Sequence, residues 1–158
     1  MGLWRRRAAA PESAGLADLG TFRQIAEQVP VNVMLLDVAT FRITYANEAT
    51  RTTIRRLEHL LPVGAEGLVG TSVDVFHKHP ERQRAILADP RNLPHRALIR
   101  LGEEHLDLLI TPLFVDGRYV AALLTWSVAT EQARLADRFE SSIKSIVDRI
   151  SGSAAELK

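Results

Sequence analysis

The chain has 158 residues, of which 46% are hydrophobic and 25% charged, so it can bury one core of its own and is too apolar to be a disordered chain. Its 20 basic and 19 acidic residues balance to a net charge of +1, which excludes the broad basic field that binds nucleic acid. Because it has no cysteine, disulfides and thiolate ligands are excluded, and histidine remains as the strong nitrogen ligand for a metal.

Residues 1–17 are predicted to form a flexible tail. The basic run Arg5-Arg6-Arg7 is followed by Ala8 to Ser13, where a signal peptide would need a longer apolar segment. No stretch of the sequence reaches the roughly 20 consecutive apolar residues that cross a bilayer. We therefore expect a chain without a membrane span, located in the cytoplasm.

Residues 18–30 are predicted to form an N-terminal helical segment. Asp18 can cap the first turn of the helix, and Pro30 ends it. Its apolar residues recur at the i, i+3, i+4, i+7 spacing of one helix face and are Phe22, Ile25, Ala26 and Val29.

Two short strands and a second helix are expected next. The strands cover 31–37 and 41–46, joined by a hairpin through residues 38–40. Asn47 provides an N-cap for a helix over 48–60, because its side chain can accept a hydrogen bond from the first turn.

The next segment carries the first candidate for chemistry. Short helices are predicted over 72–76 and 80–88, with Pro80 at the first position of the second helix. His77 lies between them, and a neutral imidazole there can donate a nitrogen lone pair to a metal.

Three longer strands are predicted over 96–101, 105–114 and 118–128, and Asp116-Gly117 between the last two is typical of a hairpin turn. Alternation with period two places Trp126 in the row that faces the core. The expected fold class is α+β, with a five-stranded antiparallel sheet and short helices on one face. The predicted inner-face residues of the last three strands are Ala97, Ile99, Leu101, Leu106, Leu108, Ile110, Val120, Ala122, Leu124 and Trp126.

Residues 130–158 are predicted to form a coiled-coil helix that dimerises. Its apolar residues follow a heptad pattern and are Ala136, Phe139, Ile143, Ile146, Ile150 and Leu157. Because the chain stops in the middle of this pattern, it is expected to be a piece of a longer protein.

The order of these elements, with Tyr45-Ala46-Asn47 at the end of the second strand, resembles a PAS sensory domain over roughly residues 22–129. The PAS domain itself would occupy residues 31–129. The run from Gly70 to Pro80, followed by Gln83-Arg84, resembles the PAS domains of soluble methyl-accepting chemotaxis receptors. Residues 139–147 are similar to the join between such a domain and the helical signalling rod of these receptors.

Some PAS domains of this group bind b-type heme and respond to oxygen. The resemblance implies that His77 ligates the heme iron and that Trp126 is the distal partner of a diatomic gas. It also implies pocket walls made by Phe76, Ile99, Leu108, Ile110 and Leu124. The sequence departs from the group at His79, where asparagine is usual, and at Arg82, where an imidazole can occur.

The implied partners are a diatomic gas, a second copy of the chain through the N- and C-terminal helices, and chemotaxis signalling proteins through a downstream region. Two other functions stay open. One is a heme-free PAS module that dimerises and relays a signal, and the other is a PAS domain that binds flavin or another small organic ligand.

From the residues alone, His77 is either a metal ligand or an ordinary loop histidine, and Trp126 is either a hydrogen-bond donor or core packing. His79 is a competing ligand. No histidine lies three or four residues from His77, which disfavours a zinc site. Because no nucleophile, base and orienting partner form a recognisable set, an enzyme is not expected. The remaining histidines receive no role; His95 and His105 are expected to be exposed at strand ends, and His59 lies among charged neighbours.

Overall fold

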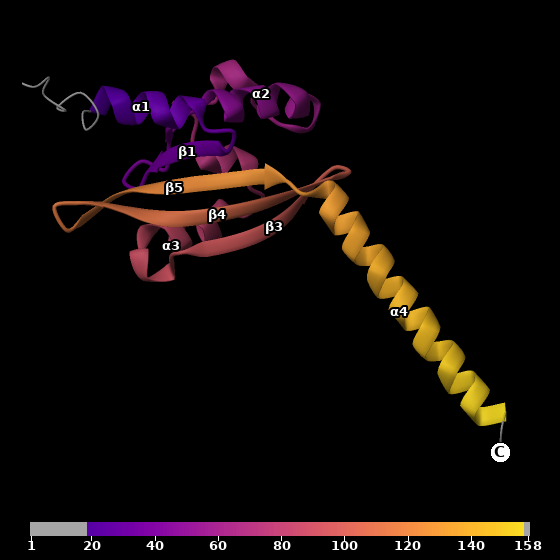
Figure 1. The fold of residues 1–158 in the computed structure, drawn as a ribbon. Coiled ribbons are helices and arrows are strands. Elements are labelled where there is room, and N and C mark those ends of the chain that lie inside the picture. The colour runs from indigo at the N-terminus through magenta and orange to yellow at the C-terminus, as the bar shows by residue number, and fades with distance from the viewer. Residues whose placement is uncertain (1–18, 157–158) are drawn as a thin grey trace, which may run out of the picture.

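The computed structural model describes residues 19–156 of the chain, and the side chains of residues 20–150. The predicted tail, the Asp18 cap and Leu157 lie outside these ranges. The protein has the predicted α+β architecture, built on a five-stranded antiparallel sheet with the order β2-β1-β5-β4-β3 (Figure 1). The strands are β1 (Asn32–Asp37), β2 (Ile43–Ala46), β3 (His95–Leu101), β4 (Glu104–Val115) and β5 (Arg118–Val128).

The α-helices are α1 (Leu19–Gln28), α2 (Glu48–Leu57), α3 (Pro80–Ala88) and α4 (Thr130–Glu156). Single turns of 3₁₀-helix complete the layer between β2 and β3, namely η2 (Glu58–Leu60), η3 (Ala65–Gly67), η4 (Val73–Phe76) and η5 (Pro90–Asn92). The helix predicted over 48–60 ends as an α-helix at Leu57 and continues as η2, and the short helix predicted over 72–76 is a 3₁₀ turn. Both differences lie in hydrogen bonding, which apolar spacing does not report.

The β4–β5 hairpin confirms the turn expected at Asp116-Gly117. Asp116 has a φ of 49° and Gly117 a φ of 74°, the pair of positive values that a two-residue type I′ turn requires. Aspartate tolerates this region better than most residues, and glycine adopts it freely. The turn therefore sets the antiparallel pairing that brings β5 between β4 and β1.

The core lies between one face of the sheet and the helical layer. The alternation read from the sequence is confirmed for most inner-face residues, since Ala122, Leu124 and Trp126 are all buried. Val120 and Ile99 are corrections, because they remain 37% and 41% exposed. Val120 lies near the tip of the β4–β5 hairpin, where the pairing register shifts: Leu113 pairs with Ala121, and Phe114 pairs with Tyr119. Ile99 lies on β3, an edge strand of the sheet.

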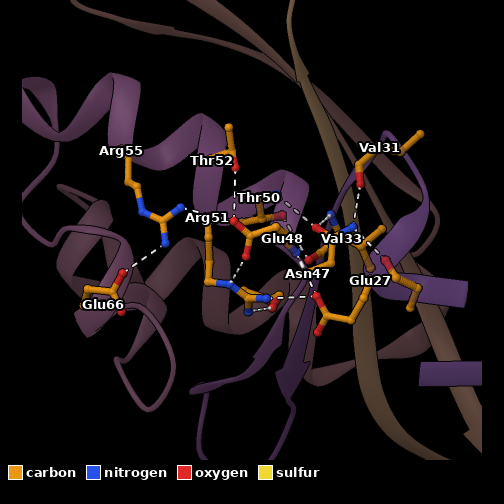
Figure 2. Close-up of polar contacts among 12 residues, drawn as sticks. Glu27, Val31, Val33, Asn47, Glu48, Thr50, Arg51, Thr52, Arg55 and Glu66 are labelled. Carbon is orange, nitrogen blue, oxygen red and sulfur yellow. Dashed lines mark hydrogen bonds and ion pairs between the residues drawn. The ribbon is translucent and has the colours of Figure 1, made fainter. Parts of the chain in front are cut away.

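Asn47 joins three elements at one buried point. Its side-chain oxygen accepts hydrogen bonds from the backbone N–H of Thr50, at 2.9 Å, and of Val33, at 3.1 Å. Its amide nitrogen donates to the carbonyls of Ala26 and Val31, at 2.9 and 2.8 Å. Figure 2 shows the Asn47 side chain beside Val31, which follows α1, Val33 on β1, and Thr50 in the first turn of α2. The predicted N-cap is thus confirmed, and it also ties α1 to the domain.

An ion-pair chain beside Asn47 makes the same connection. The Arg51 guanidinium lies 2.9 Å from a carboxylate oxygen of Glu27 on α1 and 2.9 Å from one of Glu48 on α2 (Figure 2). Arg55 continues the chain from Glu48 to Glu66. The N-terminal helix is therefore attached to α2 and the sheet by polar contacts.

The two end helices leave apolar side chains uncovered. On α1, Phe22 and Ile25 are both more than half exposed, although their spacing predicted a single apolar face. Helix α4 leaves the end of β5 and projects away from the sheet (Figure 1), with Phe139, Ile143 and Ile150 exposed along it. Over the residues that the structure describes, no helix combines the length and apolarity required to span a membrane.

Candidate functional site

An apolar cavity of about 360 Å³ separates the sheet from the helical layer. This volume falls within the range of roughly 300–1,000 Å³ that is typical of small-molecule sites. The structure brings together every site residue that was named from the sequence, since all of them line this cavity: Phe76, His77, Ile99, Leu108, Ile110, Leu124 and Trp126.

Strand pairing explains how residues far apart in the sequence reach one wall. Leu108 on β4 pairs with Ala97 on β3 and with Trp126 on β5, so these three side chains form one row across the sheet. The next row contains Ile110 and Leu124. Because side chains of alternate residues point to one face, both rows face the cavity.

Trp126 brings an unsatisfied donor to this apolar wall. Its side chain is only 5% exposed, and its indole Nε1–H is buried without a hydrogen-bond partner in the protein. Leaving a buried donor unpaired costs free energy. An apolar residue of similar size would fill the row without this cost, so the N–H is a candidate hydrogen-bond donor to a ligand.

His77 reaches the cavity from the helical layer. The Ser72 hydroxyl accepts a hydrogen bond from the Asp74 N–H and caps η4, and His77 directly follows η4. Its ring nitrogen Nδ1 lies 2.7 Å from the carbonyl oxygen of Val73. A carbonyl only accepts, so Nδ1 must carry the proton, and the lone pair of the neutral ring is left on Nε2. This is the arrangement of a metal-ligating imidazole with a backbone acceptor behind it.

His79, the competing ligand, lies elsewhere. Its side chain is 67% exposed, and its Nδ1 lies 3.4 Å from a carboxylate oxygen of Glu81. It does not line the cavity. Arg82, at the other position where the sequence departs from the family pattern, is also exposed, on α3.

His95 and His105 are corrections, because both were expected to be exposed and both are half-buried. His95 is the first residue of β3, pairs with Ile110 and lines the cavity. Its alternation with Ala97 and Ile99 was the signal in the sequence that places it on the inner face. His105 has a buried Nδ1 without a protein partner.

Gln83 on α3 was missed as a site residue. It lines the cavity, and its side-chain oxygen is buried without a protein hydrogen-bond partner. No periodicity marks it, because a single polar residue on a short helix is ordinarily on the solvent side. Among the described residues that line the cavity, Trp126 and Gln83 have a buried side-chain nitrogen or oxygen atom without a hydrogen-bond partner.

An ion pair joins Asp74 on η4 to Arg84 on α3, the two elements on either side of His77. The Arg84 guanidinium binds both carboxylate oxygens of Asp74. This hydrogen bonding holds the pKa of Asp74 below its ordinary value, so the carboxylate is charged at neutral pH. Among the described residues, no three His, Cys, Asp or Glu side chains gather to hold a metal ion by themselves. A single imidazole can hold a metal ion whose remaining ligands come from a bound cofactor and not from the protein.

No protein-family model matches the chain. Among curated proteins, the methyl-accepting chemotaxis protein McpB of Pseudomonas aeruginosa is 31% identical over an alignment of 138 residues, and the match covers 82% of this chain. The chain spans only 20% of the length of that protein.

Several solved structures share the fold. One is the Aer2 receptor from Vibrio cholerae, described as a dual PAS-heme oxygen sensor; it is 29% identical, with a TM-score of 0.59, over 62% of this chain and 93% of that one. The PAS domain of BvgS from Bordetella pertussis is 16% identical, with a TM-score of 0.53, over 80% of this chain and 97% of that one. An RNA-binding light-oxygen-voltage receptor is 18% identical, with a TM-score of 0.60, over 89% of this chain and 42% of that one.

Proposed function

We propose that this chain, which has the PAS fold, is the sensory domain of a chemoreceptor and binds heme b in its cavity to sense oxygen or a related diatomic gas. The observation that carries the proposal is which ring nitrogen of His77 carries the proton. Its Nδ1–H is bonded to the Val73 carbonyl at 2.7 Å, which leaves Nε2 as a lone-pair donor on a side chain that lines an apolar cavity.

Two likenesses support this choice. The Aer2 receptor of Vibrio cholerae is described as a PAS-heme oxygen sensor, and 93% of that structure aligns with this chain. The likeness to the chemotaxis protein McpB supports a role in a chemoreceptor, although this chain matches only 20% of the length of McpB. The activity of the whole protein and its signalling partners are therefore part of the proposal.

The residues present fit heme. Apolar walls favour a flat hydrophobic ring system, and the imidazole of His77 would offer a nitrogen ligand for its iron. When bound, the heme iron would supply the atom that holds the gas. The Val73 carbonyl would fix the ring of His77 and make it a stronger ligand, and the Trp126 N–H, which has no partner among the described residues, would be the donor of a hydrogen bond to the gas.

The output would pass through the junction of β5 and α4. Thr130, the first residue of α4, is buried, and its hydroxyl contacts the Glu104 carboxylate and accepts a hydrogen bond from the His105 N–H at 2.9 Å. Trp126 lies four residues before Thr130, near the end of β5. A change at the indole is thus close to the start of α4, whose exposed apolar residues we expect to pair with a second copy. For a signal to result, the gas must bind one arrangement of the junction more tightly than the other.

A second candidate is a small organic ligand in the same cavity. Gln83 favours it, because its buried side-chain oxygen needs a hydrogen-bond donor that a diatomic gas does not provide. The cavity has an unpaired donor on Trp126 and an unpaired acceptor on Gln83, so it fits a ligand that carries both a hydrogen-bond acceptor and a hydrogen-bond donor. In this case no heme is held, and the domain relays the binding of the organic ligand.

The visible spectrum of the purified chain titrated with hemin separates the two candidates. We expect an intense porphyrin band with saturable one-to-one binding, which His77→Ala abolishes. His79→Ala is the matched control, since this exposed histidine does not line the cavity, and it should bind hemin as the wild type does. A band that survives His77→Ala would remove the proposed ligand. A wild type that never binds hemin would leave the organic-ligand function.

A further inference from the structure

We propose that the ion pair between Asp74 and Arg84 is a positioning device that fixes the direction of the His77 imidazole toward the cavity. The inference rests on the proposed function for its purpose, because it concerns the residue that would hold the heme. Its geometry is independent of the cofactor.

The pair bridges the two elements on either side of His77. Asp74 lies in η4, three residues before His77, and Arg84 lies in α3, seven residues after it. Arg84 Nε donates to Asp74 Oδ1 at 3.1 Å, and Nη2 donates to Oδ2. This two-bond fork fixes both distance and orientation between the elements, which a single contact does not do.

The position of η4 in turn determines that of His77. The backbone N–H of His77 donates to the Asp74 carbonyl at 3.1 Å, and its ring Nδ1–H donates to the Val73 carbonyl at 2.7 Å. Both the main chain and the ring of His77 are therefore bonded to residues of η4. A shift of η4 relative to α3 would carry the imidazole with it.

Phe41 anchors both sides of this arrangement. Its carbonyl accepts a hydrogen bond from the Val73 N–H at 2.9 Å, and its ring lies 5.4 Å from the Arg84 guanidinium carbon. Phe41 has a φ of 56°, which is unusual for an aromatic residue and persists only where the surroundings hold it. The same side chain packs against the hydrophobic core. The clamp, defined as Phe41, Asp74 and Arg84, is therefore built onto a fixed point.

A purely stabilising role is the competing explanation. The Arg84 side chain is 54% exposed, and exposed ion pairs contribute little to stability. The chain offers a matched control in Arg96 and Asp107, which form the same two-bond fork, with Nε to Oδ1 at 2.9 Å, on the opposite face of the sheet. Loss of either pair should leave unfolding almost unchanged, and only loss of the first should move His77.

The first test uses the hemin-free chain. Long-range ¹H–¹⁵N correlation of the histidine rings reports which nitrogen of His77 carries the proton, and the ring chemical shifts report the surroundings of the imidazole. Because the Val73 carbonyl moves with the ring, we expect the Nδ1–H tautomer in every variant. The His77 ring shifts should match the wild type in Arg96→Gln and change in Arg84→Gln, where the imidazole loses its fixed direction toward the cavity. The double charge exchange Asp74→Arg with Arg84→Asp should restore the wild-type ring signals. Unchanged His77 ring shifts in Arg84→Gln would overturn the inference.

The second test uses hemin release to an apomyoglobin acceptor. Arg84→Gln should release hemin about tenfold faster than the wild type, at the lower end of the 10- to 100-fold effects known for outer-shell residues of metal sites. Arg96→Gln should release it at the wild-type rate. Equal rates for all three would contradict the clamp. Failure of the wild type to bind hemin would contradict the proposed cofactor, and the His77 ring shifts would still decide whether the clamp positions His77.

Discussion

Replacing Trp126 by phenylalanine should separate ligand binding from core packing. The indole N–H is buried without a protein partner, so the wild type carries the cost of an unpaired donor, about 1–3 kcal/mol. The smaller ring of phenylalanine removes that donor and keeps an aromatic side chain in the same row of the sheet.

The two effects of Trp126→Phe on stability oppose each other. Phenylalanine forfeits roughly 50 Å² of apolar burial, which at about 25 cal/mol per Å² is about 1 kcal/mol, and the small void it leaves adds to this loss. Relief of the unpaired donor offsets a similar amount. We therefore expect the free energy of unfolding of the hemin-free chain to change by less than about 1 kcal/mol, as measured by urea denaturation.

In the hemin-bound domain, Trp126→Phe should only lower the affinity for oxygen. Loss of a hydrogen bond worth about 1 kcal/mol weakens the affinity for oxygen about fivefold, chiefly through faster dissociation. Flash photolysis and gas titration measure both quantities. Trp126→Leu removes the donor and the ring together and should show the same affinity loss with a larger loss of stability. A Trp126→Phe variant with unchanged oxygen affinity, or with stability lowered by more than about 3 kcal/mol, would refute the assignment of the indole as a ligand donor.

Three further predictions concern the framework. Asn47→Ala should lower the free energy of unfolding by about 3 kcal/mol in urea denaturation, because it removes the α2 cap and leaves buried partners of both amide atoms unpaired; a loss below 1 kcal/mol would contradict this role. Asp107 has its pKa lowered by hydrogen bonding to Arg96, so the pair should contribute fully above the ordinary carboxyl value of 3.8 and lose that contribution as the pH falls through the lower folded value. Unfolding curves of Asp107→Asn should therefore differ slightly from the wild type at pH 7 and merge with it in acid. Phe139→Ser should weaken self-association in sedimentation, because it removes an exposed apolar residue from α4; an unchanged dissociation constant would count against α4 pairing.

The sheet was predictable because its determinants are local. Alternation along each strand, Asp116-Gly117 at the hairpin and the Asn47 cap each act within a few residues. The exposure of Val120 was not predictable, because it depends on a register shift in the pairing of β4 with β5, which leaves Val120 without a paired residue.

At the site, too, residues marked by a local pattern were predicted, and residues placed by the packing of separate elements were missed. The family resemblance identified His77 and Trp126, and the rows of the sheet place Leu108 and Leu124 with them at the cavity. Gln83 was missed, since the orientation of a polar residue on a short helix depends on how that helix packs. The fork between Asp74 and Arg84 was equally invisible, because its partners lie ten positions apart on two short helices whose mutual packing the sequence pattern does not report.

The coordination proposed for His77 is tested most directly by cavity rescue. His77→Gly deletes the imidazole and should abolish the porphyrin band of the hemin-treated chain. Adding free imidazole at millimolar concentration should restore the wild-type spectrum with saturation, because the small ligand can occupy the space left beside Val73. Wild-type coordination in His77→Gly without imidazole would contradict the proposal that this histidine holds the iron.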